Sequence, residues 1–322
     1  MLILSSGDLE RVLPVEEAVA AVAETLRLPP ESVSAPLRAR VDAGREGTFF
    51  VMPALATSLG SFGAKLVGVF PGNRGQGLDS VQAVYALLST ADGRPLALLE
   101  GKYLTAIRTA AVSVLATRLL ARPGPVRLAL FGTGTQARFH LAAFARLRTI
   151  TEARVCGSSP ARSEAFAREA APLYGFPLRA AAPDEAVAGA DLVCACTTSP
   201  TPVFRGELLA PGAHVNAVGA FQPHARELDD TAIARARVWV DTLEGALSEA
   251  GDLLVPLGSG ALRREQIVGD LGALVRGEVP GRSSEAETTI FKSVGCALED
   301  LAAATAAYRK AVQVGAGRQV AL

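Results

Sequence analysis

The chain lacks an excess of charge of either sign and has few cysteines. Its 32 Lys and Arg balance 32 Asp and Glu, so the formal net charge is +0 and no basic surplus is available for a nucleic-acid backbone. The four cysteines form no C-x-x-C pair, and Cys156, Cys194 and Cys196 lie within apolar patterns typical of strands. We therefore expect reduced cysteines in a cytoplasmic protein that binds no nucleic acid.

Long apolar runs and histidines are also scarce. We find no apolar stretch of the length that spans a bilayer, and the start MLILSS lacks the charged residues and long apolar core of a signal peptide. The three histidines, His140, His214 and His224, have no metal-ligand spacing with Cys or Asp. We expect no membrane contact and no metal, and we interpret the histidines as structural or exposed.

A glycine-rich turn lies between a strand pattern and a helix pattern. Apolar residues predict a strand over 126–131, helical periodicity covers 137–146, and Gly132-Thr133-Gly134-Thr135-Gln136-Ala137 lies between them. In G-x-G-x-x-G/A the first Gly permits the turn, the second lets backbone N–H groups approach a pyrophosphate, and the small third residue allows close packing. A plain turn has the same pattern, but further strand patterns at 153–156 and 191–196 have βαβ spacing. Together they predict a dinucleotide site.

The residues after the second of these strands bear on the choice of dinucleotide. A carboxylate there binds the ribose hydroxyls of NAD, whereas its absence together with a nearby Arg favours NADP. Here Ser158, Ser159 and Arg162 follow the strand, and no carboxylate precedes Glu164. Because hydroxyls and a guanidinium suit a 2′-phosphate, the sequence favours NADP(H) over NAD(H). The serines also suit a helix N-cap, and the two roles are compatible.

The first third of the chain predicts one helix followed by a sheet. Apolar residues at helical spacing predict a single amphipathic helix over 8–26. The segment 71–77 is too rich in Gly for regular structure, so we expect a mobile loop, either a surface turn or a lid. A mostly antiparallel sheet is predicted from strand patterns at 37–41, 48–52, 64–70, 81–89 and 95–100.

The rest of the chain alternates strands and helices. An apolar helix is predicted over 104–120, and Pro123-Gly124-Pro125 marks a domain boundary. Later strands at 215–218 and 238–240 complete the pattern of a doubly wound parallel sheet. Ser284-Glu285-Ala286-Glu287 predicts a capping box that begins a long helix through Ile290.

We therefore predict an α/β protein with two domains. A substrate-binding and dimerisation domain of α+β type, built from both termini, covers 1–120. A Rossmann-type dinucleotide-binding domain with a doubly wound parallel sheet covers 121–295. The C-terminal helix of 296–322 returns to the first domain.

Several motifs in the same order resemble the ornithine cyclodeaminase/mu-crystallin family. They are LTAIRTAA at 104–111, the Gly132 turn and GAHVNAVGA at 212–220, and the resemblance extends from about 36 to 308, with RELDD at 226–230 and FKSVG at 291–295. The family includes ornithine cyclodeaminases, alanine dehydrogenases, ketimine and Δ1-pyrroline-2-carboxylate reductases, and NADPH-binding mu-crystallin. The resemblance implies a homodimer with a substrate domain beside a Rossmann domain and a cleft between them.

The resemblance also implies site residues. It places Arg38, Lys65 and Arg108 around a substrate carboxylate. The chemistry agrees, because a cation within an apolar strand is costly to bury unless an anion meets it, although an internal salt bridge would satisfy it equally. Further substrate contacts are expected from Ser80, Gln82 and Glu249, and dinucleotide contacts from Thr109, Gly132, Thr133, Gly134, Thr135, Gln136, Ser158, Ser159, Arg162, Thr197, Thr198, Val218 and Ser293.

Two departures from the family pattern bear on the reaction. Ornithine cyclodeaminases carry an aspartate after the Val-Gly-Gly/Ala segment, and this chain has Phe221 there. Oxidising an amino acid requires a base that takes a proton from its ammonium group, which Phe cannot provide. Reducing a preformed cyclic ketimine requires a held carboxylate, an apolar wall and a nicotinamide. Val81, which follows Ser80 where mu-crystallin has a histidine, removes a second polar group.

These observations lead us to expect an NAD(P)H-dependent reductase of cyclic ketimine carboxylates. The expected substrate is Δ1-pyrroline-2-carboxylate, which yields L-proline, with Δ1-piperideine-2-carboxylate as a second substrate. Catalytic roles fall to Lys65, Arg108 and Phe221, and Lys65 is the candidate that assists protonation at nitrogen. Alternatives are ornithine cyclodeaminase, in which Glu249 or Asp229 would replace the missing aspartate, alanine dehydrogenase, and a non-catalytic NADPH-binding protein.

Overall fold

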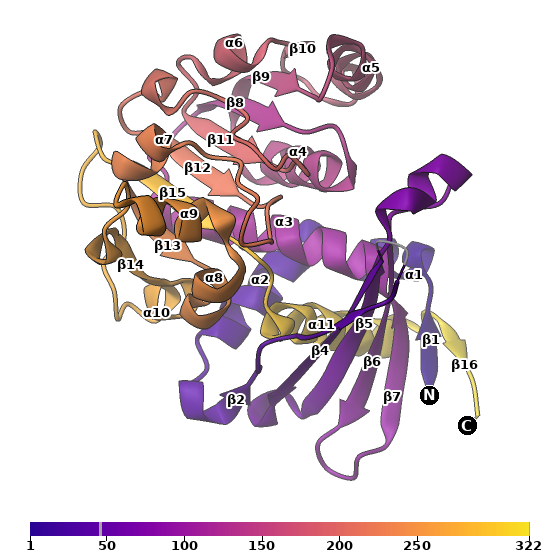
Figure 1. Ribbon diagram of the computed structural model, residues 1–322. Coiled ribbons are helices and arrows are strands. Elements are labelled where there is room, and N and C mark those ends of the chain that lie inside the picture. The colour runs from indigo at the N-terminus through magenta and orange to yellow at the C-terminus, as the bar shows by residue number, and fades with distance from the viewer. Residues whose placement is uncertain (45–46, 322) are drawn as a thin grey trace. The chain divides into compact units, whose positions relative to one another are not determined.

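The computed structural model describes residues 1–44 and 47–321 and divides into two compact units (Figure 1). The first unit joins Met1–Val112 to Cys296–Leu322, and the second is Ser113–Gly295. The division falls inside α3 (Gly101–Leu120), whereas the sequence predicts a boundary after residue 120. The difference arises because α3 is one continuous helix whose residues contribute to both units.

The first unit is built on an eight-stranded sheet in the order β16-β1-β7-β6-β5-β4-β2, with β3 also paired to β4. Every pair is antiparallel except β1 with β7, as the alternating pattern predicts. The strands are β1 (Leu2–Leu4), β2 (Val33–Ser34), β3 (Ala39–Asp42), β4 (Thr48–Ala56), β5 (Ser61–Val69), β6 (Val81–Ser89), β7 (Pro95–Glu100) and β16 (Arg318–Gln319).

Two helices replace the single helix predicted over 8–26, which was wrong. The chain forms α1 (Ser6–Val12) and α2 (Val15–Leu26), because Pro14 has no N–H and disfavours a helical conformation at Leu13 before it. The predicted irregular loop also contains a 3₁₀ helix at Pro71–Gln76. The long helix α11 (Ala297–Val314) packs on α2 and on β4 and β5.

The second unit is a parallel sheet in the order β10-β9-β8-β11-β12-β15-β13-β14. From β8 the chain adds β9 and β10 on one side and then β11 and β12 on the other, so the order reverses between β8 and β11. In such sheets ligands bind at this reversal, beyond the carboxyl ends of the strands. The strands are β8 (Val126–Phe131), β9 (Ile150–Cys156), β10 (Leu178–Ala180), β11 (Leu192–Ala195), β12 (His214–Ala217), β13 (Ala236–Val240), β14 (Ile267–Asp270) and β15 (Thr288–Lys292).

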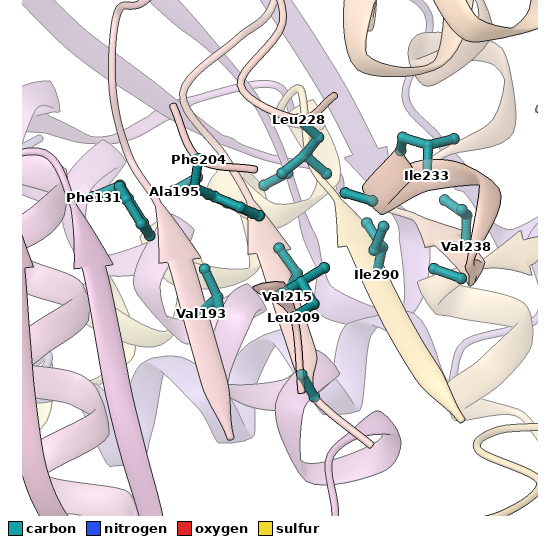
Figure 2. Close-up of a cluster of buried hydrophobic side chains, with 14 of the residues drawn as sticks. Phe131, Val193, Ala195, Phe204, Leu209, Val215, Leu228, Ile233, Val238 and Ile290 are labelled. Atoms are coloured by element: carbon teal, nitrogen blue, oxygen red, sulfur yellow. The ribbon is translucent and has the colours of Figure 1, made fainter. Parts of the chain in front are cut away.

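Apolar side chains from adjacent strands of this sheet form one buried cluster. Figure 2 shows Val193, Val215 and Ile290 on neighbouring strands, with Phe131 and Phe204 in contact at a ring-centroid distance of 5.0 Å. The helices of this unit are α4 (Thr135–Leu147), α5 (Pro160–Ala170), α6 (Pro183–Val187), α7 (Asp230–Ala234), α8 (Leu243–Glu249), α9 (Gly251–Ser259) and α10 (Leu271–Val275).

The capping box predicted at 284–287 was wrong. Residues Thr288–Lys292 form β15, a fully buried strand inserted between β12 and β13, and α11 begins only at Ala297. Glu287 accepts hydrogen bonds from the backbone and hydroxyl of Ser283, so it closes a turn that enters the strand. The β-branched residues of TTIFK suit a strand buried on both faces.

Helix α3 corrects the expectation about membrane-spanning length. Among the described residues, α3 is the helix that is long enough and apolar enough to cross a bilayer. However, 78% of its most apolar stretch is buried within the protein. A buried core helix passes the same test, so α3 is weak evidence for a membrane.

Candidate functional site

The turn between β8 and α4 has the geometry that a bound dinucleotide requires. Gly132 has φ +109°, and a Cβ there would lie 2.6 Å from the carbonyl oxygen of Cys196, so only glycine fits. Gly134 caps α4, and its first turn has no side-chain cap. A Cβ on Gly134 would have no described atom within 4 Å. Uncapped N–H groups beside open space suit a pyrophosphate.

The carboxyl ends of four strands gather most of the predicted dinucleotide contacts. The Gly132 turn follows β8, Thr197 follows β11, Val218 follows β12 and Ser293 follows β15. The hydroxyl of Ser293 donates to Asp241 at 3.0 Å. Other predicted contacts on this edge are Thr133, Gly134, Thr135, Gln136, Ser158, Ser159, Arg162 and Thr198.

The segment after β9 serves at least as a helix cap. The Ser159 hydroxyl accepts a hydrogen bond from the backbone N–H of Arg162 at 3.4 Å and begins α5. Ser158 and Arg162 are exposed, so their polar groups are accessible to a ligand. The capping role that the sequence suggests is therefore present for Ser159, and it leaves Ser158 and Arg162 accessible.

A buried carboxylate that the sequence did not single out joins two loops of this edge. Glu227 accepts hydrogen bonds from the backbone and hydroxyl of Thr197 at 2.6 and 2.8 Å, and from the N–H groups of Gly219 and Ala220 at 2.6 and 3.2 Å. A Cβ on Gly219 would lie 1.9 Å from the carbonyl oxygen of Thr197, so the loops touch. The motif RELDD at 226–230 was the available signal for this residue.

Two further buried charges support Glu227. Asp252 accepts from the backbone N–H groups of Glu227 and Leu228, and it pairs with the Lys292 ammonium at 2.9 Å. Lys292 also donates to the carbonyl oxygen of Ala220 at 2.6 Å. Burial raises the pKa of Glu227, while the Lys292 charge opposes that rise. The network fixes the backbone of the segment that ends at Phe221.

In the first unit, two of the predicted substrate cations meet two carboxylates of α11. The Lys65 ammonium lies 3.0 and 2.8 Å from the two oxygens of Asp300, and Arg108 Nε donates to Asp300 at 2.9 Å. A second Arg108 nitrogen donates to Glu299 at 2.8 Å. The internal salt bridge that the sequence leaves open is therefore present, and all four side chains are buried.

Arg38 belongs to the same electrostatic group. The charges of Arg38 and Arg108 both act to lower the pKa of Lys65, so the three predicted cations share one environment. Burial is the largest cause, and it lowers the pKa of Lys65 to about 8 against the opposing charge of Asp300. The guanidinium of Arg38 also lies 4.8 Å from the ring centre of Phe50.

Other predicted site residues have ordinary structural contacts. Phe221 is half-buried and packs against the core of the second unit. The hydroxyl of Thr109 donates to the carbonyl of Thr105 in its own helix. One carboxylate oxygen of Asp229 accepts a hydrogen bond from the N–H of Ala232 at the start of α7, and the other accepts from the N–H of Gly206, so both oxygens have structural partners. Ser80 and Glu249 are partly exposed, and Gln82 is exposed with its amide donating to the carbonyl of Asp79.

His140 lies beside two cysteines of a distant strand segment in the second unit. Ligand atoms of His140, Cys194 and Cys196 lie within 4.8 Å of one another, a cluster that sequence spacing did not reveal. His140 Nδ1 lies 2.8 Å from the carbonyl of Gln136, and Nε2 lies 2.9 Å from the Ser113 hydroxyl. Burial raises the pKa of Cys196 well above its usual range, and both ring nitrogens of His140 already have hydrogen-bond partners. We interpret the cluster as structural.

Comparison with known proteins places the chain in a family. A model described as the ornithine cyclodeaminase/mu-crystallin family matches residues 1–315. The chain belongs to this family. It is 37% identical over 324 residues, 99% of both chains, to a Δ1-pyrroline-2-carboxylate reductase of Bacillus cereus.

Two solved structures have folds closely similar to that of this chain. A Thermococcus litoralis Δ1-pyrroline-2-carboxylate reductase in complex with NADH and L-proline has a TM-score of 0.95 at 35% identity, covering 99% of this chain and 100% of that one. An archaeal alanine dehydrogenase dimer with bound NAD has a TM-score of 0.93 at 31% identity, covering 100% and 99%. The Rossmann-type fold and the nicotinamide cofactor predicted from the sequence are thereby confirmed.

Proposed function

We propose that this chain catalyses the NAD(P)H-dependent reduction of Δ1-pyrroline-2-carboxylate to L-proline. The observation that carries the proposal is a group of three cations, buried Lys65 and Arg108 with the partly exposed Arg38, which suits a carboxylate. The chain that holds this group matches along its whole length a reductase in complex with NADH and L-proline. The uncapped glycine turn of the second unit supplies the cofactor site.

The residues of the chain then have separate roles. A bound nicotinamide dinucleotide supplies a hydride to the imine carbon. Arg38 and Arg108 hold the substrate carboxylate, and Lys65 Nζ gives a proton to the imine nitrogen as the C=N bond is reduced. Phe221 offers an apolar wall and cannot act as a base. It therefore cannot take the ammonium proton that an amino-acid substrate must lose before it is oxidised.

The reaction is tested by initial rates on a panel of substrates. We expect NADPH oxidation with Δ1-pyrroline-2-carboxylate, and more slowly with Δ1-piperideine-2-carboxylate. Ammonia release from L-ornithine without net cofactor change would favour a cyclodeaminase, and NADH oxidation with pyruvate and ammonia would favour an alanine dehydrogenase. Tight NADPH binding without any turnover would favour a binding protein.

We also propose that NADP(H) is preferred over NAD(H), because Ser158 and Arg162 are exposed after β9 and no carboxylate lies there. Arg162→Ala is expected to weaken NADPH binding about tenfold, the loss of one charge-assisted hydrogen bond, and to change NADH binding less than about twofold. Fluorescence titration of both dinucleotides measures this. Equal losses for the two cofactors would contradict the preference.

Assembly and location belong to the same proposal. We infer a homodimer, in line with the related alanine dehydrogenase, which is described as a dimer. We also place the protein in the cytoplasm, since its four cysteines, all among the described residues, are free thiols.

A further inference from the structure

A row of side chains on one face of the first sheet contains two polar residues in an apolar setting. Met52, Lys65, Tyr85 and Leu99 lie opposite one another on β4, β5, β6 and β7, and all four are buried. Helix α11 packs on this sheet and brings Asp300 to Lys65. A lysine so placed is costly to bury without a partner, and Asp300 is that partner.

Asp300 is a shared acceptor for both cations. One of its oxygens accepts from Lys65 at 3.0 Å and from Arg108 at 2.9 Å, and the other lies 2.8 Å from Lys65. Glu299 accepts from the other end of the Arg108 guanidinium at 2.8 Å. Within the described part of the chain, the buried Tyr85 hydroxyl has no hydrogen-bond partner, and the Asp300 charge contributes to raising its pKa. Asp300 is therefore the group that ties Lys65 to the rest of the cluster.

The charges of the cluster suit a monoanionic substrate. The cluster has one net positive charge when every group is ionised, because its three cations outnumber its two carboxylates. The cations are Arg38, Lys65 and Arg108, and the carboxylates are Glu299 and Asp300. One substrate carboxylate would neutralise it, whereas a cluster without Lys65 protonated would have no surplus. Carboxylate binding thus depends on the ammonium form of Lys65.

Building on the proposed reductase function, we propose that Asp300 is a positioning residue that keeps Lys65 protonated and aimed for proton transfer to the imine nitrogen. In the transfer, a Lys65 N–H bond breaks and an N–H bond forms on the substrate. The C=N π pair moves to nitrogen while the hydride forms the new C–H bond. The amine of Lys65 then regains its proton from water, and Asp300 stays ionised throughout.

Every charged group around Lys65 bears on this role. Burial lowers its pKa to about 8, with Arg108 and Arg38 acting in the same direction, and Asp300 alone among the leading causes raises it. Removing the Asp300 charge therefore lowers the pKa of Lys65 further. Among the described residues, Lys65 faces Asp300 of α11, Arg108 of α3, Arg38 before β3 and its cross-strand neighbour Tyr85 of β6, and Glu299 of α11 acts on it through Arg108.

The test is the pH dependence of kcat/KM for Asp300→Asn. The alkaline limb, near pH 8 in the unchanged protein, should move to lower pH by about one to three units, because an opposite charge at this distance shifts a pKa by that much. The variant should lose most of its activity at about pH 7.5, where the unchanged protein retains most of its own, and should regain it below the shifted limb. A purely structural role predicts that activity falls by the same factor at every pH. An alkaline limb at the same pH as in the unchanged protein would therefore overturn the proposal.

Two further variants keep the test decisive if Asp300→Asn folds poorly. Asp300→Glu retains the charge, so its limb should stay near pH 8 even where kcat falls, and a shifted limb would overturn the proposal. Thr305→Val, a change on the same helix that loses only a hydrogen bond to Ser61 of β5, should leave the profile unchanged.

A binding measurement separates this proposal from the reaction itself. The affinity of pyrrole-2-carboxylate, an unreactive carboxylate, should fall above about pH 8 in the unchanged protein, where the cluster loses its one net positive charge. In Asp300→Asn the fall should come at lower pH and be smaller, because Arg38 and Arg108 against Glu299 still leave one net positive charge. This shift without any ketimine turnover would refute the reductase while supporting the link between Asp300 and Lys65. Ketimine turnover in which Asp300→Asn shifts neither the pH dependence of binding nor that of kcat/KM would support the reductase and refute the role of Asp300.

Discussion

Lys65→Met is expected to lower kcat/KM for Δ1-pyrroline-2-carboxylate by about 1000-fold, equivalent to about 4 kcal/mol of transition-state stabilisation. The substitution removes a cation from the substrate carboxylate and the proton donor from the imine nitrogen. The protein should still fold, because Asp300 keeps its bond to Arg108 at 2.9 Å and methionine fills a similar volume. Steady-state kinetics with NADPH measure the loss, and circular dichroism checks the fold.

The matched control is Lys310→Met, which makes the same replacement at an exposed position of α11. Its kcat/KM should stay within about twofold of the unchanged protein, since exposed substitutions away from a site have small effects. If Lys65→Met retained more than about a tenth of the activity, Lys65 would be a structural partner of Asp300 and not a catalytic residue.

Gly134→Ala is expected to weaken dinucleotide binding by about 100-fold while leaving thermal unfolding unchanged. The φ of −88° suits alanine, and no described atom lies within 4 Å of the added Cβ, so the turn accepts the methyl group. The methyl group would occupy space that the pyrophosphate needs. Binding would then lose one or two charge-assisted hydrogen bonds from the backbone to the pyrophosphate, worth about 1.5–3 kcal/mol each. Calorimetric titration with NADPH measures the affinity.

Substitutions at two other glycines serve as comparisons for Gly134→Ala. Gly132→Ala should lose both binding and stability, because its φ is +109° and a Cβ would lie 2.6 Å from the Cys196 carbonyl oxygen. Gly175→Ala, with open space around it and no positive φ, should change neither property. Full affinity in Gly134→Ala would show that the pyrophosphate lies elsewhere.

Local patterns predicted much of the fold. The strands at 81–89 and 95–100 were predicted with the bounds observed for β6 and β7, because alternation on a half-buried sheet is a local signal. The helix predicted to begin at a capping box of 284–287 was wrong because a Ser-x-x-Glu signal is also local, whereas the burial of β15 on both faces depends on distant strands.

The candidate site was predictable in its cofactor half and less so in its charged half. Glycines of the turn follow a fixed spacing, so Gly132 and Gly134 were found from sequence. The partners of Lys65 and Arg108 lie 235 and 192 residues away in the chain, at Asp300, and no spacing links them. Glu227 was missed for the same reason, because its role depends on two loops that meet only in the folded sheet.

The most direct test of the reductase is transfer of label from the cofactor to the product. The purified protein would be incubated with Δ1-pyrroline-2-carboxylate and NADPH carrying deuterium at both C4 positions, and the proline analysed by mass spectrometry and NMR. We predict one deuterium per proline at Cα, with one NADPH oxidised for each proline formed. Proline without deuterium, or no proline at all, would contradict the account.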